Sequence, residues 1–172
     1  MPLVLTLVLG VVLAALGSAM AIGSATETMI AGAHRDGTVL FYAADAAVEF
    51  AVEELARSDW PAVLDTGTRS TFVDETLPVS RSIEGPAGYE VYAYGPLADM
   101  LGRASREVDP YVAVWLADLT DPPAGAGSER VVGILATAFG PGGGRRSVAL
   151  TVRLSSADEE VIVERLSWMS EP

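Results

Sequence analysis

The stretch from Pro2 to Ile22 reads PLVLTLVLGVVLAALGSAMAI, and this apolar run decides the fold of the chain. No charged residue precedes Glu27, and Leu, Val, Ala and Ile dominate the run. A helix rises roughly 1.5 Å per residue, so about 20 such residues cross the ~30 Å hydrocarbon core of a bilayer. We therefore expect this stretch to be a membrane-spanning helix that anchors a small extracytoplasmic domain.

A cleaved signal peptide is the alternative interpretation of the same run, because Ala19-Met20-Ala21 resembles a small-x-small cleavage site. Three features oppose it. No basic segment precedes the apolar run, the run is longer than the usual apolar region of about 7 to 15 residues, and helical character continues past Ala21. A retained helix is the favoured interpretation.

Small side chains recur along one side of the expected helix. They are Gly10, Ala14, Gly17 and Ala21, spaced by three or four residues. A helix face of this kind lets a second helix approach closely. Glycine also costs a helix up to about 1 kcal/mol relative to alanine, so Gly17 and Gly23 are alternatively positions where the helix loosens.

The helix is expected to continue beyond the membrane span, because residues 26–57 contain no proline. An apolar stripe at helical spacing runs along Leu40, Ala44, Val48, Val52 and Leu55, and Phe41 and Phe50 widen it. The pattern predicts a single helix of about 55 residues. We divide the chain into a hydrophobic helical segment 1–25, an amphipathic continuation 26–58 and a β-rich domain 59–172.

Two features indicate where this helix ends. Glu53 and Arg57 make a favourable pair four residues apart, of the kind that stabilises an exposed helix. The sequence Ser58-Asp59-Trp60-Pro61 follows, and a proline disfavours helix in the residue before it. We expect the helix to stop at this sequence.

Beyond Pro61 the pattern changes from helical to strand-like. Alternating or β-rich runs occur at Gly88–Tyr94, Tyr111–Ala117, Val131–Phe139, Ser147–Leu154 and Val161–Trp168. The third and fourth runs flank the glycine-rich segment Gly140–Arg146, which predicts an antiparallel hairpin. Thr71–Val73 and Leu77–Val79 are either short strands or loop, and Asp118–Ser128 is expected to be an exposed loop. We expect an α+β fold, with the second half of the helix packed on an antiparallel sheet.

Composition excludes several classes of function. The formal net charge is −12, so the folded part is expected to repel nucleic acids and anionic lipid surfaces. The chain contains no cysteine, which removes disulfides, thiolate zinc sites and cysteine nucleophiles. Nucleic acid is therefore not an expected partner.

Candidates for chemistry are few. His34 is the only histidine, and its place beside Arg35 on the expected helix favours a solvated or interhelical role over a metal or catalytic site. The segment Gly140–Arg146 lacks the Gly-Lys-Ser/Thr ending of a phosphate-binding loop and precedes a strand, so a hairpin turn is favoured. We expect no catalytic residue, no metal and no cofactor.

Acidic residues in the expected loops are a second candidate for chemistry. Asp118 with Asp121, and separately Asp158-Glu159-Glu160, supply oxygen ligands of the kind that Ca²⁺ prefers. Neither group has the spacing of an EF-hand, so solvated acidic loops are the favoured interpretation. We expect Asp118, Asp121, Gly142 and Gly143 to lie in surface loops.

Aromatic residues of the expected strands suggest a surface patch. Tyr92 and Tyr94 are expected on the same face of the sheet, because side chains alternate along a strand. Together with Trp115 they could form an adhesive patch, although core packing or subunit contact is the favoured interpretation.

Two segments of the helix resemble a known family. They read ETMIAGAHRD from Glu27 to Asp36 and LFYAADAAVE from Leu40 to Glu49. Together they resemble PilX-like type IV pilus assembly proteins, which typically carry T-E-x-x-I-A-x-x-x-R-D, a short gap and Y-A-A-E-A-x-x-E. The resemblance covers about the first 57 residues, and the hairpin near residues 139–146 and the closing Leu166-Ser167-Trp168 look similar to the same group.

The resemblance implies a pilin or minor, priming pilin. Such a protein is cut after a glycine by a prepilin peptidase, is held in the inner membrane as a single-pass precursor, and is assembled by the pilus machinery into an extracellular filament. Its partners are other copies or other pilin subunits, bundled through the N-terminal helix. Residues expected to pack or assemble are Leu5, Gly10, Ala14, Gly17, Ala21, Glu27, Arg35, Tyr42 and Glu49.

The sequence departs from the family pattern in two places. Leu5 stands where major pilins usually carry a glutamate that pairs with a neighbouring N-terminus, which disfavours the role of repeating subunit. No basic leader ending in glycine precedes Met1, so we expect either that Met1 is the mature terminus or that the reading frame starts upstream. The alternative function is a membrane-anchored extracytoplasmic binding or sensor domain that does not polymerise, whereas an anchored hydrolase lacks supporting residues.

Overall fold

The structure, a computed structural model, describes residues 2–73, 85–104, 109–120, 129–140, 143–157 and 160–171. The elements in chain order are α1 (Pro2–Arg57), α2 (Trp60–Thr66), β1 (Glu90–Pro96), α3 (Leu97–Met100), β2 (Tyr111–Asp118), β3 (Arg130–Phe139), β4 (Arg145–Ala157) and β5 (Glu160–Glu171). The chain divides into two compact units, Met1–Asp36 and Gly37–Pro172. We call the first the N-terminal unit and the second the sheet unit.

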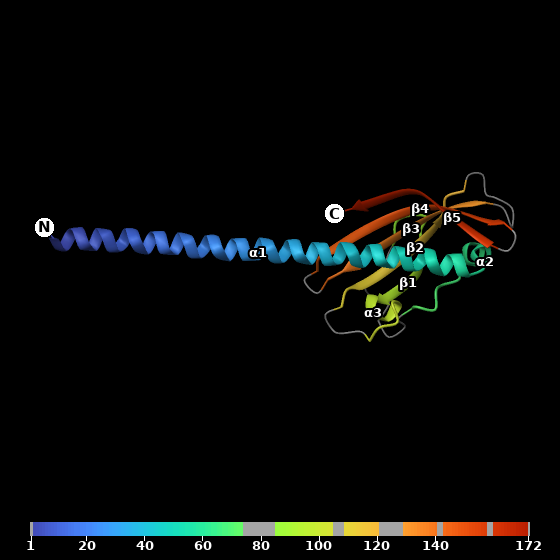
Figure 1. Ribbon diagram of the computed structural model, residues 1–172, viewed down its shortest axis with the longest axis horizontal. Helices are drawn as coiled ribbons and strands as arrows, with labels where there is room; N and C mark the ends of the chain where they lie inside the picture. The colour runs from blue at the N-terminus through green and yellow to red at the C-terminus, as the bar shows by residue number, and fades with distance from the viewer. Residues whose placement is uncertain are drawn as a thin grey trace. The chain divides into compact units, whose positions relative to one another are not determined.

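The sheet unit confirms the expected α+β fold. Its five strands lie in the order β1-β2-β3-β4-β5, and every neighbouring pair is antiparallel. Figure 1 shows the part of α1 that belongs to this unit running along one face of the sheet. Strands that follow one another in sequence pair with one another, so the sheet forms from local connections.

The stripe predicted on the second half of α1 packs against this sheet. Leu40, Ala44, Val48 and Leu55 are buried as expected, while Val52 is only partly buried. The sheet contributes alternate residues of its strands to the same core, among them Val112, Val114, Leu116, Val132, Ile134, Val148, Leu150 and Val152. Alternation puts these residues on one face, because successive strand side chains point to opposite sides.

Alanines fill the remainder of the contact between α1 and the sheet. Ala43, Ala47 and Ala51 are buried in the same core, although the sequence pattern did not single them out. A methyl group occupies little space, so the helix backbone lies close to the strands along this side. Larger side chains at these positions would overpack the core.

The expected end of α1 is confirmed, but the next helix was not predicted. The helix ends at Arg57, and Arg57 forms the expected ion pair with Glu53. A short α2 then starts at Trp60, with Pro61 in its first turn, where a missing N–H costs nothing. It ends at Gly67, whose φ of 63° is the left-handed conformation that favours glycine, and whose N–H bonds to the Val63 carbonyl.

The predicted β3–β4 hairpin is present. Phe139 pairs with Arg145, and the Gly140 N–H donates to the Gly144 carbonyl at 2.9 Å. Gly143 has a φ of 77°, which a non-glycine residue adopts only with strain. Gly142 lies outside the described residues.

The expectation that Tyr92 and Tyr94 share a face is wrong. The register of β1 against β2 shifts between Val91 and Ala93, so one extra residue is inserted in β1. Such a bulge changes the alternation of side chains. Tyr92 consequently joins the core facing α1, whereas Tyr94 joins a second cluster with Trp115 on the other face.

The second cluster confirms core packing for these aromatic residues. Tyr94, Ala113 and Trp115 are 9% exposed or less. Val73 packs against this cluster and makes an isolated parallel bridge to Tyr94. Leu77–Val79, the other ambiguous segment, lies outside the described residues.

Candidate functional site

The most unusual feature of the N-terminal unit is its exposed apolar surface. Every described residue from Pro2 to Asp36 is exposed. Twelve large apolar side chains between Leu3 and Ile22 have exposed fractions from 48% to 76%. Within the described residues this helix is long and apolar enough to cross a membrane, and none of its most apolar window is buried.

The small residues predicted for helix packing lie open on this surface. A Cβ atom added at Gly10 or Gly17 would meet no heavy atom within 4 Å beyond the helix itself. Ala14 and Ala21 are exposed as well. Within the part of the chain that the structure describes, the space that a second helix would need beside these residues is therefore open.

Polar side chains within the apolar run are satisfied by their own helix. The Thr6 hydroxyl donates to the Leu3 carbonyl at 2.9 Å, and the Ser18 hydroxyl donates to the Ala15 carbonyl at 2.9 Å. Such bonds leave no hydroxyl proton unpaired in an apolar medium. The helix can therefore be surrounded by lipid or by other helices along its whole apolar length.

The remaining predicted assembly residues differ in their surroundings. Leu5, Glu27 and Arg35 are exposed in the N-terminal unit. In the sheet unit, Tyr42 is exposed, but the Glu49 carboxylate accepts a 2.5 Å ion-pair hydrogen bond from Arg165 of β5. Glu49 thus already has a partner inside its own chain.

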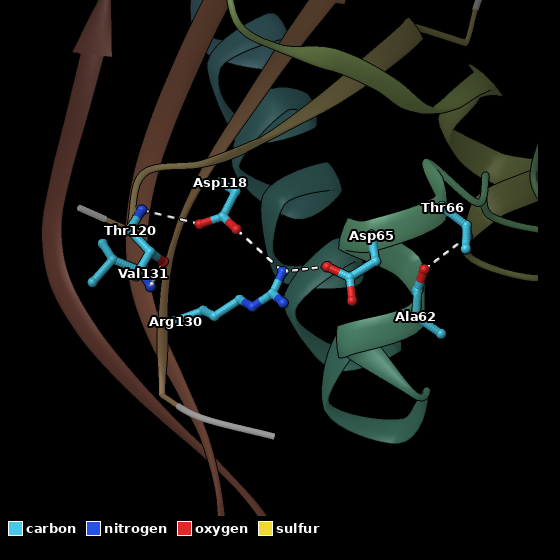
Figure 2. Close-up of polar contacts among 7 residues, drawn as sticks. All are labelled: Ala62, Asp65, Thr66, Asp118, Thr120, Arg130 and Val131. Carbon is cyan, nitrogen blue, oxygen red and sulfur yellow. Dashed lines mark hydrogen bonds and ion pairs between the residues drawn. The ribbon is translucent and has the colours of Figure 1, made fainter. Parts of the chain in front are cut away.

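Among the described residues of the sheet unit, one cationic side chain is buried. The Arg130 side chain, at the start of β3, is only 6% exposed. Its Nη1 atom donates to the Asp65 carboxylate of α2 at 2.7 Å and to the Asp118 carboxylate of β2 at 3.2 Å (Figure 2). Arg130 therefore ties a helix and two strands together.

Neighbouring bonds hold Asp118 in this position. Its second oxygen accepts the Thr120 N–H at 3.0 Å, and the Thr120 hydroxyl accepts the Val131 N–H at 3.0 Å (Figure 2). The hydrogen bond to Asp65 raises the pKa of Arg130, and the charges of Asp65 and Asp118 add to this effect against the lowering effect of burial. The guanidinium stays charged at every pH that the fold survives.

A second polar group joins α1 to the edge strand β1. The Ser70 hydroxyl donates its single proton to the Glu54 carboxylate, and its oxygen lies 2.8 and 2.7 Å from the two carboxylate oxygens. Tyr92 faces the same carboxylate: burial raises the pKa of Tyr92 well above the ordinary tyrosine value, and the charge of Glu54 acts in the same direction. Two backbone hydrogen bonds hold the segment 70–73 along β1: the Ser70 N–H donates to the Tyr92 carbonyl at 2.9 Å, and the Tyr94 N–H donates to the Phe72 carbonyl at 3.1 Å.

A shallow cleft of about 240 Å³ opens between α2 and the ends of β1 and β2. Its walls include the apolar Val63, Leu64 and Leu116, and its rim carries the carboxylates of Glu90 and Asp118. Small-molecule sites typically measure about 300–1,000 Å³, so this cleft is better matched to a single side chain.

The described residues show no arrangement of three or more His, Asp or Glu side chains that could hold a metal ion. Asp118, the last residue of β2, is engaged with Arg130, while Asp121 lies outside the described residues. Asp158 and Glu159 also lie outside them. His34 lies exposed on α1.

Sequence reasoning missed the Arg130 group. Asp65 is 65 positions before Arg130, so no local spacing connects the two residues. One signal was present: Arg130 directly precedes the apolar run that became β3. A charged residue at the end of a buried strand needs a partner, but the sequence does not say which one.

Comparisons of the chain with protein-family models, with curated proteins and with solved structures found no match. Function is therefore inferred from the residues and contacts of the chain itself.

Proposed function

We propose that this chain is a structural subunit of a type IV pilus-like filament, a pilin or minor pilin, held in the inner membrane by its N-terminal helix until it is assembled. The observation that carries the proposal is the apolar surface between Leu3 and Ile22, whose large side chains are exposed among the described residues. The small-residue face within this surface supports helix packing as the means of assembly.

The free energy involved is large. Full burial of a Leu, Val, Ile or Met side chain is worth about 1.5–3 kcal/mol, so twelve such side chains with exposed fractions of 48% to 76% represent on the order of 10–20 kcal/mol in water. A cost of this size exceeds the net stability of many domains. The helix therefore needs either lipid or other helices around it.

The small-residue face favours transfer of the helix from lipid to a bundle of other helices. Lipid tails are as apolar as leucine, so helices leave lipid for one another only when they pack closely. Gly10, Ala14, Gly17 and Ala21 permit that close packing. The resemblance of residues 26–49 to PilX-like proteins supports the same role.

Fractionation of cells tests the proposal. Filaments are sheared from the native cells, and the chain is sought by mass spectrometry in the sheared fraction and in the inner membrane. We expect the chain in the filaments, with an N-terminus produced by cleavage after a glycine. Its recovery solely from the inner membrane, with no processed form, would contradict the proposal and favour a non-polymerising anchored domain.

A further inference from the structure

The two ends of the sheet differ in charge. The strand registers place Glu90, Asp118 and Arg130 at the end next to α2, which we call the acidic end. They place Phe139 and Arg145 at the opposite end, which we call the hairpin end. Figure 1 shows α2 beside the first of these ends.

Carboxylates outnumber cations at the acidic end. Arg130 is shared between Asp65 and Asp118. Glu90 is exposed, and the described residues provide no ion pair for it. Its carboxylate lies against Gly67, at the rim of the cleft between α2 and the strand ends. The cleft therefore presents unneutralised negative charge above apolar walls.

The hairpin end carries two arginines at the start of β4. Arg145 is exposed, Arg146 is partly exposed, and neither forms an ion pair with a described residue. The Arg146 guanidinium lies beside Gly37, about 3.4 Å from where a Cβ atom would stand. Neighbouring positions on a strand point to opposite faces, so Arg145 stands clear of the helix.

We propose that the hairpin end of one copy docks on the acidic end of a second copy, with Arg145 in the cleft. The methylene groups of arginine would lie along Val63 and Leu64, and its guanidinium would bind the carboxylates of Glu90 and Asp118. The cleft volume suits one such side chain. Arg146 adds attraction between the two copies without entering the cleft.

This contact is heterologous, because two different surfaces meet. A heterologous contact that does not close into a ring repeats without limit and produces a filament. The inference rests on the proposed function for its biological setting, and it adds a second assembly contact that does not involve the apolar helix. It also gives the acidic sheet unit a way to associate with itself despite the net charge of −12.

Cysteine crosslinking tests this contact in the full chain, because introduced cysteines are its only thiols. Thr68 lines the cleft, and Phe139 is the exposed cross-strand partner of Arg145. The double variant Thr68→Cys/Phe139→Cys keeps both charged partners. Cell envelopes are treated with a short bis-maleimide and run on a denaturing gel.

The proposal predicts a ladder of dimers, trimers and larger products from the double variant and none from either single variant. The control Glu53→Cys/Phe139→Cys, which moves one thiol to the exposed side of α1, should give no ladder. An isologous contact would instead give dimers from Phe139→Cys alone, and that result would overturn the proposal.

Charge reversal provides the second part of the test. In the double-cysteine chain, Glu90→Arg or Arg145→Glu should each reduce the ladder more than about fivefold, because each loses an interfacial ion pair and sets like charges opposite each other. The combination Glu90→Arg/Arg145→Glu should restore it. Arg145→Gln, a milder change, should give an intermediate loss. The absence of a ladder, or an equal amount of ladder in all charge variants, would overturn the proposal.

The same samples separate this proposal from the proposed function. Sheared filaments that contain the chain but yield no ladder would contradict the docking of sheet units and leave the filament role intact. A ladder in membranes of cells whose filaments lack the chain would support the docking and contradict the filament role.

Discussion

The Arg130 group gives a prediction whose size follows from the burial of its members. Removing both carboxylates, in Asp65→Asn/Asp118→Asn, leaves a guanidinium that is 6% exposed without a charged partner. Loss of the partners of a buried charge costs about 3–5 kcal/mol. The Nε atom of Arg130 is already buried with no hydrogen-bond partner among the described residues, so the local structure offers little compensation.

Removing the cation instead of the two carboxylates should lower the free energy of unfolding much less. Arg130→Met removes the buried charge together with its desolvation cost, and leaves two carboxylates whose side chains are 49% and 33% exposed. Water can solvate carboxylates at that exposure, so we expect a loss of about 1 kcal/mol or less. The acid double variant should therefore be less stable than Arg130→Met by about 2–4 kcal/mol.

Thermal unfolding of the full chain in detergent micelles measures this difference. Near-ultraviolet circular dichroism follows the sheet unit, because Trp60 and Trp115 are both buried within it. A change of 1 kcal/mol shifts the midpoint by roughly 3 °C for a unit of this size, so the two variants should differ by about 6–12 °C. Equal midpoints, or a lower midpoint for Arg130→Met, would refute this account of the group.

Three further predictions concern the sheet unit. Tyrosine in the unfolded chain ionises near pH 10, whereas buried Tyr92 stays protonated there, so the contribution of Tyr92 to the free energy of unfolding should be full below about pH 10 and fall by up to about 1.4 kcal/mol per pH unit above it. Melts between pH 9 and 11 should show a flatter pH dependence in Tyr92→Phe, and an unchanged dependence would contradict the raised pKa of Tyr92. Ala47→Leu should overpack the contact between α1 and the sheet and destabilise the fold by about 1–3 kcal/mol, whereas the control Ala62→Leu, on the exposed side of α2, should change little. Similar unfolding midpoints for the two variants would mean that α1 packs loosely on the sheet. Gly143→Ala should cost about 1 kcal/mol because its φ is 77°, and a neutral result in the same melting assay would show that the turn relaxes.

Much of the fold could be predicted from period and length. The five strands occur where alternating or β-rich runs occur, and α1 extends through the apolar run and the amphipathic stripe to Arg57. Hydrophobic periodicity predicts these elements because apolar residues every three or four positions form one buried face of a helix, and apolar residues at every second position form one buried face of a strand. The short helices α2 and α3 were missed, since 7 and 4 residues are too few to show a helical period.

The bulge in β1 and the polar groups could not be predicted in the same way. Strict alternation along the strand predicted that Tyr92 and Tyr94 share a face. The bulge that separates them depends on the register of β1 against β2, and the local sequence does not specify this register. The contact of Arg130 with Asp65 joins residues far apart in the chain, and only the three-dimensional arrangement brings them together. The small-residue face with Gly10 and Gly17, in contrast, follows from spacing alone, and its role in helix packing stays a prediction.

The amount of the chain recovered in sheared filaments, measured for Gly17→Leu and Gly23→Leu, tests the central claim most directly. Both glycines lie in α1 with nothing within 4 Å of an added Cβ, so the two substitutions change size, hydrophobicity and helix propensity equally. At 3.6 residues per turn, Gly23 points about 120° away from Gly17 and off the small face. We predict that both variants insert into the membrane, that Gly17→Leu lowers recovery about tenfold, corresponding to ~1–2 kcal/mol of helix packing, and that Gly23→Leu does not. Equal recovery of the two variants would contradict assembly through the small-residue face.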